Sequence, residues 1–253
     1  MMFKQIHRNF STAKTYPKTF DRILIANRGE ITRRVIKTCK KMGIETVAVY
    51  SDADRHSMFV KEADQAFRIG PPPTNQSYLD MNIMLEVVKA SGAQAVHPGY
   101  GFLSENPEFQ KMLQANNVTF IGPGTEAIVA MGDKIESKKL AKNAGVSTVP
   151  GYLGEVDEMS EVFRISNEIG YPVMIKASAG GGGKGMRIAF NDKEAEEGFK
   201  LSKEEAISSF GDGRIFIEKY IQAPRHIEYQ ILGDMHGNYV WLPERECSVQ
   251  RRN

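Results

Sequence analysis

The sequence predicts an α/β fold in which a Rossmann-like parallel unit is followed by a smaller α+β unit and then by the start of a further sheet. Short apolar segments alternate with amphipathic helical segments over residues 22–120, which is the pattern of a parallel sheet with crossover helices. A glycine-rich loop joins two strand-like segments within residues 171–190. Strict polar and apolar alternation begins near Arg225, as half-exposed strands require.

The first unit contains five candidate strands and the helices that connect them. A helix is predicted from about Glu30 to Met42, because Ile31, Val35, Cys39 and Met42 make an apolar face and Gly43 supplies a C-terminal stop. With the strands on either side, this helix forms a βαβ unit of the Rossmann type. The candidate strands are residues 23–26, 46–50, 65–69, 93–96 and 118–121.

The second unit is predicted to start after a helix at residues 134–144. That helix ends at Gly145, and Val149-Pro150-Gly151 then gives a linker. The glycine loop would be the tip of a hairpin, so the unit would act as a mobile lid that carries the loop. Its predicted elements are a helix at 157–169, strands at 173–177 and 186–190, a helix at 193–208 and a closing segment at 214–219.

The segment after Arg225 is predicted to be strand with one ionisable face. His226, Glu228 and Gln230 alternate with Ile227, Tyr229 and Ile231, and residues 244–252 repeat the polar face. Such a face either lines a site or is simply solvated, and the residues alone leave both readings open.

The glycine loop is predicted to cover nucleotide phosphates. Lys176 ends an apolar strand, and residues 180–183 are four consecutive glycines followed by Lys184. Without side chains, backbone N–H groups can approach phosphate oxygens, and the two lysines supply positive charge. The loop is not a Walker A loop, because Ser178 stands at the position of its first glycine and Gly185 at that of its Ser or Thr. The alternative is a flexible surface turn.

Composition and termini limit the classes of function. The 253 residues are 41% hydrophobic and 25% charged, with a net charge of +2, so charge gives no case for nucleic acid or anionic membrane, and no apolar run reaches the roughly 20 residues needed to span a bilayer. Cys39 and Cys247 are too few for a C-x-x-C zinc site.

Residues 1–20 are basic, rich in Ser and Thr and free of acidic residues, which is typical of a mitochondrial transit peptide. The alternative for this segment is a disordered tail.

Several long runs, in order, resemble the N-terminal half of the biotin carboxylase family, whose members are ATP-grasp enzymes. The resemblance extends from Arg22 to Asn253. Residues 241–242, 244–248 and 250–253 are most similar to the propionyl-CoA branch of this family, whereas relatives acting on pyruvate or 3-methylcrotonyl-CoA typically have a histidine where Asn253 stands. The matching runs are residues 25–30, 97–106, 131–134, 176–186 and 224–228.

The resemblance implies an ATP site. Lys134 and Lys176 would hold the α- and β-phosphates, and the backbone at Gly182 and Gly183 would close over them. The hinge that reads adenine would be Glu218, Lys219, Tyr220 and Ile221, largely through backbone groups. His226 and Gln250 would contact the ribose and its neighbourhood, and Asn253 would be a further nucleotide-site position. For Lys134, His226 and Gln250, an ordinary structural or surface role is the alternative.

The resemblance also implies the reaction and its partners. ATP would phosphorylate bicarbonate to carboxyphosphate, which would carboxylate biotin for an acyl-CoA carboxylase, with propionyl-CoA as the expected substrate. The expected domains are a transit peptide at 1–20, the N-terminal Rossmann-like domain at 21–130, a helical linker and ATP-grasp lid at 131–220, and a truncated beginning of the C-terminal ATP-grasp subdomain at 221–253.

Much of the family's machinery is expected beyond residue 253. No catalytic or metal-binding residue is expected within the chain, and the Mg²⁺ ligands and the bicarbonate-holding residues would follow it. Biotin would be carried on a separate domain, a carboxyltransferase β subunit would be the partner, the full-length protein would be an oligomer, and the location would be the mitochondrial matrix. The chain is therefore expected to be a fragment that is inactive alone. The alternatives are another acyl-CoA or pyruvate carboxylase, another ATP-grasp ligase, or a truncated, non-catalytic nucleotide-binding module.

Overall fold

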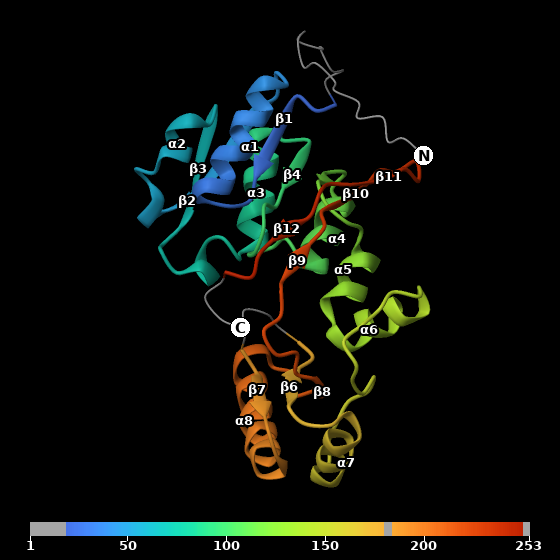
Figure 1. Ribbon diagram of the computed structural model, residues 1–253. Helices are drawn as coiled ribbons and strands as arrows, with labels where there is room; N and C mark the ends of the chain where they lie inside the picture. The colour runs from blue at the N-terminus through green and yellow to red at the C-terminus, as the bar shows by residue number, and fades with distance from the viewer. Residues whose placement is uncertain (1–18, 180–183, 250–253) are drawn as a thin grey trace, which may run out of the picture. The chain divides into compact units, whose positions relative to one another are not determined.

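The computed structural model describes residues 19–179 and 184–249 of the chain. Two compact units divide it, the first up to Val129 and the second from Ala130 onward (Figure 1). Residues 1–18 of the transit peptide expected at 1–20 lie outside the described residues, as do the loop glycines Gly182 and Gly183 and the site positions Gln250 and Asn253.

The first unit is a five-stranded parallel sheet in the order β3-β2-β1-β4-β5, which confirms the predicted Rossmann-like α/β class. Leu24 of β1 pairs with Val47 of β2 on one side and with Val96 of β4 on the other. The strand order therefore reverses between β1 and β4, as in doubly wound sheets. The strands are β1 (Arg22–Ile25), β2 (Glu45–Ser51), β3 (Gln65–Gly70), β4 (Ala95–His97) and β5 (Thr119–Phe120).

Helices cover both faces of this sheet. Because side chains alternate along a strand, Leu24 packs into the largest apolar cluster with residues of α3 and α4. Its neighbours Ile23 and Ile25 pack with residues of α1 and α2. The helical segments are α1 (Gly29–Lys41), α2 (Met58–Glu62), α3 (Met81–Ser91), α4 (Pro107–Ala115) and α5 (Thr125–Gly132), with short 3-10 turns at Asp52–Asp54 and Thr74–Gln76.

The predicted apolar face of α1 is only partly correct. Cys39 is buried as predicted, but the other buried residues of the helix are Thr32 and Ile36, because Ile36 packs against Ala48 and Phe59. Met42 is 41% exposed, and it lines an open cavity of about 620 Å³ beside the helix together with Ile31 and Val35. The helix ends where predicted, with Gly43 at φ +70° in the left-handed conformation that favours glycine.

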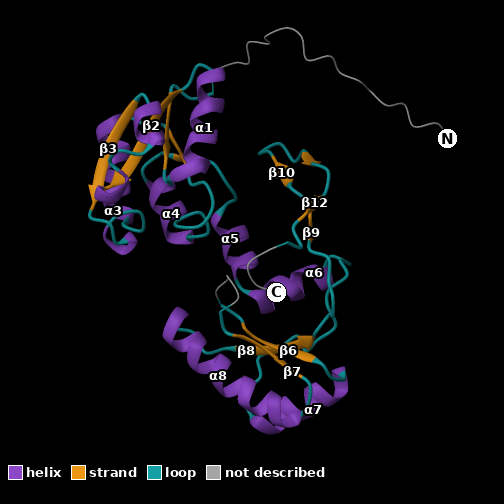
Figure 2. Ribbon diagram, turned by 60° about the vertical axis from the view of Figure 1, so that its left-hand side comes forward, coloured by secondary structure: helices purple, strands orange, loops and turns teal. Residues whose placement is uncertain are grey.

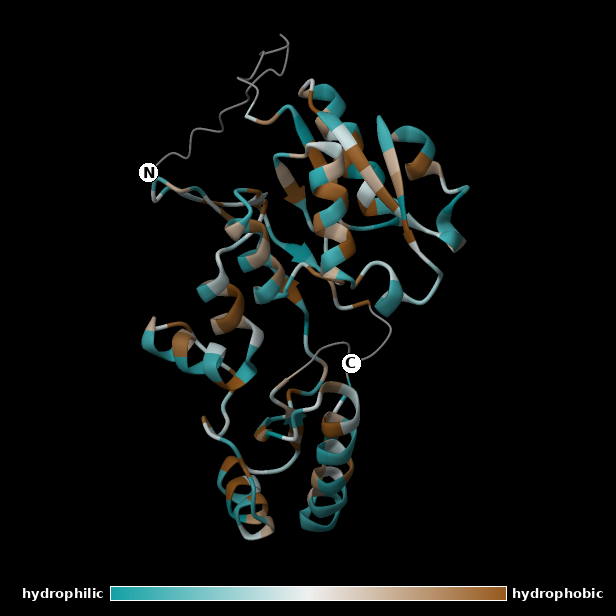
Figure 3. Ribbon diagram, turned by 180° about the vertical axis from the view of Figure 1, so that it is seen from behind, coloured by the Kyte–Doolittle hydropathy of each residue, from teal (hydrophilic) through white to brown (hydrophobic). Residues whose placement is uncertain are grey.

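The second unit is built on an antiparallel sheet in the order β7-β6-β8. Two helices lie on one face of it (Figure 2), where Val162 of α7 and Phe199 of α8 join Ile175 and Ile217 of the strands in one apolar cluster. The alternating teal and brown of α8 in Figure 3 is that of an amphipathic helix. The elements are α6 (Lys134–Asn143), α7 (Met159–Ile169), β6 (Val173–Ala177), β7 (Met186–Ala189), α8 (Asp192–Phe210) and β8 (Ile215–Lys219), close to the predicted ranges.

A segment at residues 150–156, called here the strap, runs along the outer edge of β8. The Lys219 N–H donates to the Pro150 carbonyl (2.7 Å), and the N–H groups of Tyr152 and Val156 donate to the carbonyls of Ile217 (3.0 Å) and Ile215 (2.8 Å). Gly151 forms an isolated bridge with Glu218, with no room for a side chain between them. The predicted linker thus pairs with the sheet.

The segment after Arg225 forms two short antiparallel pairs and not the long strands predicted. β9 (Ile227–Glu228) pairs with β12 (Arg245–Glu246), and β10 (Ile231–Gly233) pairs with β11 (Tyr239–Trp241). Neither face of these pairs is buried by the described residues, since both polar and apolar positions such as Ile231 and Trp241 are exposed. Alternation in the sequence therefore predicted strand but not its interruption at Tyr229 and Gln230.

Candidate nucleotide site

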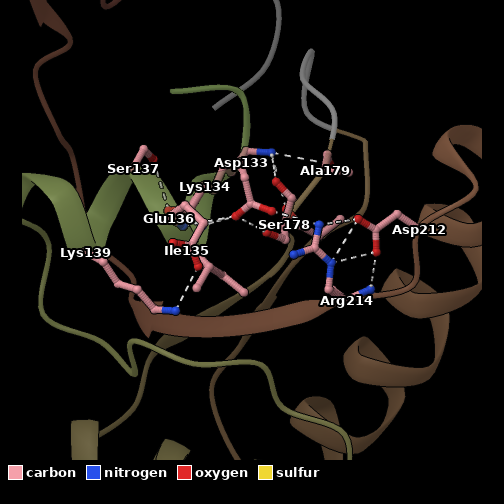
Figure 4. A network of polar contacts seen from close by, with 11 residues as sticks. Asp133, Lys134, Ile135, Glu136, Ser137, Lys139, Ser178, Ala179, Asp212 and Arg214 are labelled. Atoms are coloured by element: carbon pink, nitrogen blue, oxygen red, sulfur yellow. Dashed lines mark hydrogen bonds and ion pairs between the residues drawn. The ribbon is translucent and has the colours of Figure 1, made fainter. Parts of the chain in front are cut away.

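The start of α6 brings Lys134 to the carboxyl end of β6. Asp133 caps the helix, because its carboxylate accepts hydrogen bonds from the N–H groups of Ile135 (2.9 Å) and Glu136 (3.0 Å), as N-caps do. The Lys134 ammonium then donates to the carbonyls of Ala177, Ser178 and Ala179 at 3.2–3.4 Å, as Figure 4 shows in part. One of the two predicted phosphate lysines therefore lies where the glycine loop begins.

Ser178 fixes this junction. It is fully buried, its N–H donates to the Arg214 carbonyl (2.8 Å), and its hydroxyl donates to Asp133 (3.0 Å). Arg214 forms ion pairs with Asp133 (2.7 Å) and with Asp212 (2.6 Å) (Figure 4). The loop start, the cap of α6 and the segment before β8 are thus tied together by one polar network, which the sequence did not predict.

The second predicted phosphate lysine, Lys176, lies on β6 and forms an ion pair with Glu218 of β8. Strand pairing sets this contact, since Met174 is directly opposite Glu218 and Lys176 follows it on the same face of β6. The other oxygen of the Glu218 carboxylate lies 2.6 Å from the ammonium of Lys138. Three lysines and one carboxylate therefore form a group, called here the lysine cluster: Lys134, Lys138, Lys176 and Glu218.

The lysine cluster is electropositive and partly desolvated. Burial, followed by the charge of Lys176, lowers the pKa of Lys134, whereas Asp133 and Glu218 act in the opposite direction. An ammonium held in this way is stabilised by a nearby anion. The arrangement is therefore suited to bind a compact polyanion such as the phosphates of a nucleotide.

Asp133 is held in its charged form. Burial would raise the pKa of Asp133, but hydrogen bonds from the Glu136 N–H, Ser178 and Arg214 together hold that pKa below its usual value. Because Arg214 pairs with this carboxylate, Asp133 offsets the positive charge of the lysine cluster only in part.

The predicted adenine hinge follows directly from β8. The side chain of Lys219 donates to the carbonyls of Gly170 (2.8 Å) and Tyr171 (3.0 Å), and the Tyr220 N–H donates to the Pro172 carbonyl (3.1 Å). Within the described residues, the Ile221 N–H has no backbone partner. The side chain of Glu218, predicted to act through its backbone, belongs to the lysine cluster.

His226 belongs to the β9–β12 pair. Its N–H donates to the Ser248 hydroxyl (2.8 Å) and its carbonyl accepts from the Cys247 N–H (2.7 Å), while its Nε2 lies 3.9 Å from the Glu228 carboxylate. These contacts do not join His226 to the lysine cluster.

Sequence reasoning missed Lys138, although a signal was present. Lys138 is four residues after Lys134, and residues at this spacing share one face of a helix. Its partner could not be inferred, because Glu218 is 80 residues away along the chain.

Comparison with known proteins gives two family matches that together extend over most of the chain. Residues 19–128 match the N-terminal domain of biotin carboxylase. Residues 133–253 match the family described as the carbamoyl-phosphate synthase L chain, ATP-binding domain.

Two of the relatives found are propionyl-CoA carboxylase alpha chains. The mitochondrial propionyl-CoA carboxylase alpha chain of Mus musculus is 64% identical over 98% of this chain and 34% of its own length. The propionyl-CoA carboxylase alpha chain of Ruegeria pomeroyi is 64% identical over 92% of this chain and 34% of its own. The chain thus spans about a third of the length of the curated relatives it matches.

Solved structures agree with the sequence matches. Biotin carboxylase from Campylobacter jejuni, in a nucleotide complex, has a TM-score of 0.90 at 44% identity, over 92% of this chain and 52% of that one. The biotin carboxylase domain of the 2-oxoglutarate carboxylase of Hydrogenobacter thermophilus, a dimer with MgADP, ADP and bicarbonate, has a TM-score of 0.88 at 48% identity, over 92% and 51%. Sequence, fold and neighbours agree that this chain belongs to the biotin carboxylase family of ATP-grasp proteins.

Proposed function

We propose that this chain is the ATP-binding front half of a biotin carboxylase, in which Lys134 and Lys176 hold the α- and β-phosphates. The observation that carries the proposal is that both side chains belong to the lysine cluster at the end of β6, where the glycine loop starts. Neutralising the charge of a transferring phosphoryl group is the main electrostatic task in this kind of chemistry.

The hydrogen bonds of Lys134 support an exchange of partners on nucleotide binding. Its ammonium is 3.2–3.4 Å from three carbonyl oxygens, which is at the long end for N–H···O hydrogen bonds. Phosphate oxygens offer shorter, charge-assisted bonds. A nucleotide can therefore compete for Lys134 without unfolding the loop junction.

The adenine is proposed to bind at the hinge formed by Glu218, Lys219, Tyr220 and Ile221. Because the backbone N–H groups of Lys219 and Tyr220 are already used within the described fold, the Ile221 N–H is the donor we propose for the base. Gly182, Gly183, Gln250 and Asn253 remain proposals from the family resemblance, as does a ribose contact for His226.

The substrate and partners are proposed from the named relatives. Their identification as propionyl-CoA carboxylase alpha chains supports an acyl-CoA carboxylase, with propionyl-CoA as its substrate, and the mitochondrial relatives support the mitochondrial matrix. A structural neighbour that holds ADP and bicarbonate supports carboxylation of biotin driven by ATP. The proposal also includes a biotin carrier domain, a carboxyltransferase β subunit and an oligomeric full-length protein.

Within the described residues, no helix is long and apolar enough to cross a membrane.

The described residues do not supply a site for Mg²⁺. Over residues 19–179 and 184–249, no group of three or more His, Cys, Asp or Glu side chains could hold a metal ion. The carboxylates of the adjoining network, Asp133 and Asp212, are both paired with Arg214. No step of the proposed chemistry is therefore assigned to a metal held by these residues.

A different ATP-grasp ligase is the second candidate, favoured by the match of residues 133–253 to a carbamoyl-phosphate synthase domain. The match of residues 19–128 to biotin carboxylase supports the first proposal instead. Avidin separates them in assays of the enzyme isolated from its source, because avidin abolishes a biotin-dependent activity and leaves the other unchanged.

The phosphate assignment is tested by Lys176→Met in this chain. Hydrogen bonds to charged groups contribute about 1.5–3 kcal/mol, so the Kd for ATP should rise by about 10- to 100-fold, while the Kd for adenosine stays the same. Glu218 keeps Lys138 as a partner in this variant, which protects the fold. Lys200→Met is the control, because Lys200 is exposed and pairs with Glu196 on the outside of α8. Calorimetric titration that gives equal ATP affinity for Lys176→Met and the unchanged chain would remove Lys176 from the site.

A further inference from the structure

Lys138 has an environment unlike that of Lys139, the next residue on its helix. Its side chain is 14% exposed, and its ammonium lies 2.6 Å from Glu218, 3.0 Å from the Val149 carbonyl and 5.6 Å from the centre of the Phe216 ring. By contrast, Lys139 is 46% exposed and pairs with Glu136 on the same helix. Taking an ammonium out of water is costly unless it is paired, so Lys138 has a specific place in the fold.

The carboxylate of Glu218 is shared between two cations. One oxygen pairs with Lys176 of β6 and the other with Lys138 of α6, and the Glu218 side chain is only 9% exposed. With both lysines present, this triad carries one net positive charge. Without Lys138, Lys176 and Glu218 would form a neutral pair.

This difference matters for an anion that binds Lys176. In a partly buried site, the interaction between charges a few ångströms apart is several times stronger than in water. A carboxylate whose only cation is Lys176 would hold that ammonium and repel phosphate. A second cation on Glu218 weakens both effects.

We infer that Lys138 is a positioning residue of the phosphate site, which engages Glu218 and so leaves Lys176 available to a phosphate group. The inference rests on the proposed function, since it takes the ligand of Lys176 to be a nucleotide phosphate. Lys138 itself need not touch the nucleotide. A purely structural role, in which Lys138 only anchors Val149 and the start of the strap, is the competing explanation.

The two explanations differ in which ligand they affect. Lys138→Gln keeps a side chain that can donate to Glu218 and Val149 but removes the charge, and Lys138→Arg keeps the charge. Lys139→Gln is the matched control, one residue away on the same helix. The Kd values for ATP, ADP and adenosine are measured by calorimetric titration of the chain at low and high salt, and folding is checked by thermal unfolding.

We expect Lys138→Gln to weaken ATP and ADP binding about tenfold at low salt, with a smaller effect at high salt because screening weakens charge effects. Adenosine binding should be unchanged, Lys138→Arg should recover most of the affinity, and Lys139→Gln should match the unchanged chain.

The outcomes separate the inference from the proposed function. Full ATP affinity in a folded Lys138→Gln chain overturns the inference and leaves the proposed function standing. Equal losses for ATP and adenosine also overturn it, in favour of the structural role. If Lys138→Gln does not fold, Lys138→Arg decides the question. An ATP affinity of Lys138→Arg clearly below that of the unchanged chain overturns the inference. Absence of ATP binding by the unchanged chain overturns both.

Discussion

Replacing Gly151 by alanine should detach the strap from β8. A Cβ atom at this position would lie 2.7 Å from the Cβ of Glu218, 2.8 Å from its Cα and 2.8 Å from the Ile217 carbonyl oxygen, whereas ordinary contacts begin at 3.4 Å. All three atoms belong to the backbone of β8 or sit directly on it, so a side-chain rotation cannot relieve the clash. The strap must therefore move away by about half an ångström or more.

The cost can be worked out from the hydrogen bonds that this movement breaks. Two of them flank Gly151, from the Lys219 N–H to Pro150 and from the Tyr152 N–H to Ile217. At a net contribution of about 0.5–1.5 kcal/mol each, Gly151→Ala should destabilise the second unit by about 1–3 kcal/mol. The displacement also disturbs Glu218, so we expect weaker ATP binding in the same variant.

Urea unfolding with segment-resolved hydrogen exchange measures the effect on each unit. Gly154→Ala is the control, because the three atoms nearest to a Cβ there all belong to the side chain of Tyr152, which can turn aside. The second unit should lose stability in Gly151→Ala but not in Gly154→Ala, and the first unit should be unaffected in both. A change below about 0.5 kcal/mol in Gly151→Ala, within the range of ordinary surface substitutions, would show that the close approach of strap and strand is not needed.

Two further predictions concern the apolar core of the first unit and the loss of folding stability at low pH. Phe109 is fully buried and packs edge-to-face on Phe120, so Phe109→Ala should lower the stability of the first unit by about 3–5 kcal/mol. The protection of β6 amides from hydrogen exchange should stay unchanged. A parallel loss of protection in β6 would contradict two independently stable units. The pKa of Asp133 is lowered in the fold, so its contribution is present above the pKa of the unfolded chain and is lost as the pH falls through the lower folded pKa. Asp133→Asn should therefore cost about 1–2 kcal/mol at pH 7, as a cap and a charged hydrogen bond would, and progressively less as the pH is lowered below the usual range of carboxyl groups. Urea unfolding that gives the same difference at all pH values would exclude the carboxylate charge as the cause.

The fold was predictable from the sequence where local signals decide it. Gly43 and Gly145 end their helices as predicted, in the left-handed conformation, and the apolar run around Lys176 forms β6 with the predicted bounds. The face of α1 was less predictable because a helix between a sheet and a neighbouring helix buries a wide stripe. Which residue lies at its centre, here Ile36, depends on Phe59 of α2.

The site was predictable only for the residues that a motif marks. Lys134 and Lys176 lie in runs that resemble the family, and the structure brings them into one group. The partners that control their charge, Lys138 and Glu218, come from segments 80 residues apart and meet only because α6, the strap and β8 pack together. The spacing of Lys138 and Glu218 along the chain cannot indicate that they meet, because their contact depends on tertiary packing.

The strap also limits how the β7-β6-β8 sheet can pair with a second copy of the chain. An unpaired strand edge is a template for another chain, and the strap already bonds to alternate residues of β8 at Ile215, Ile217 and Lys219. Among the described residues, β7 is then the edge of the β7-β6-β8 sheet that stays unpaired. A second copy could add to this sheet from one side only, so edge-to-edge pairing through the β7-β6-β8 sheet alone would end at a dimer.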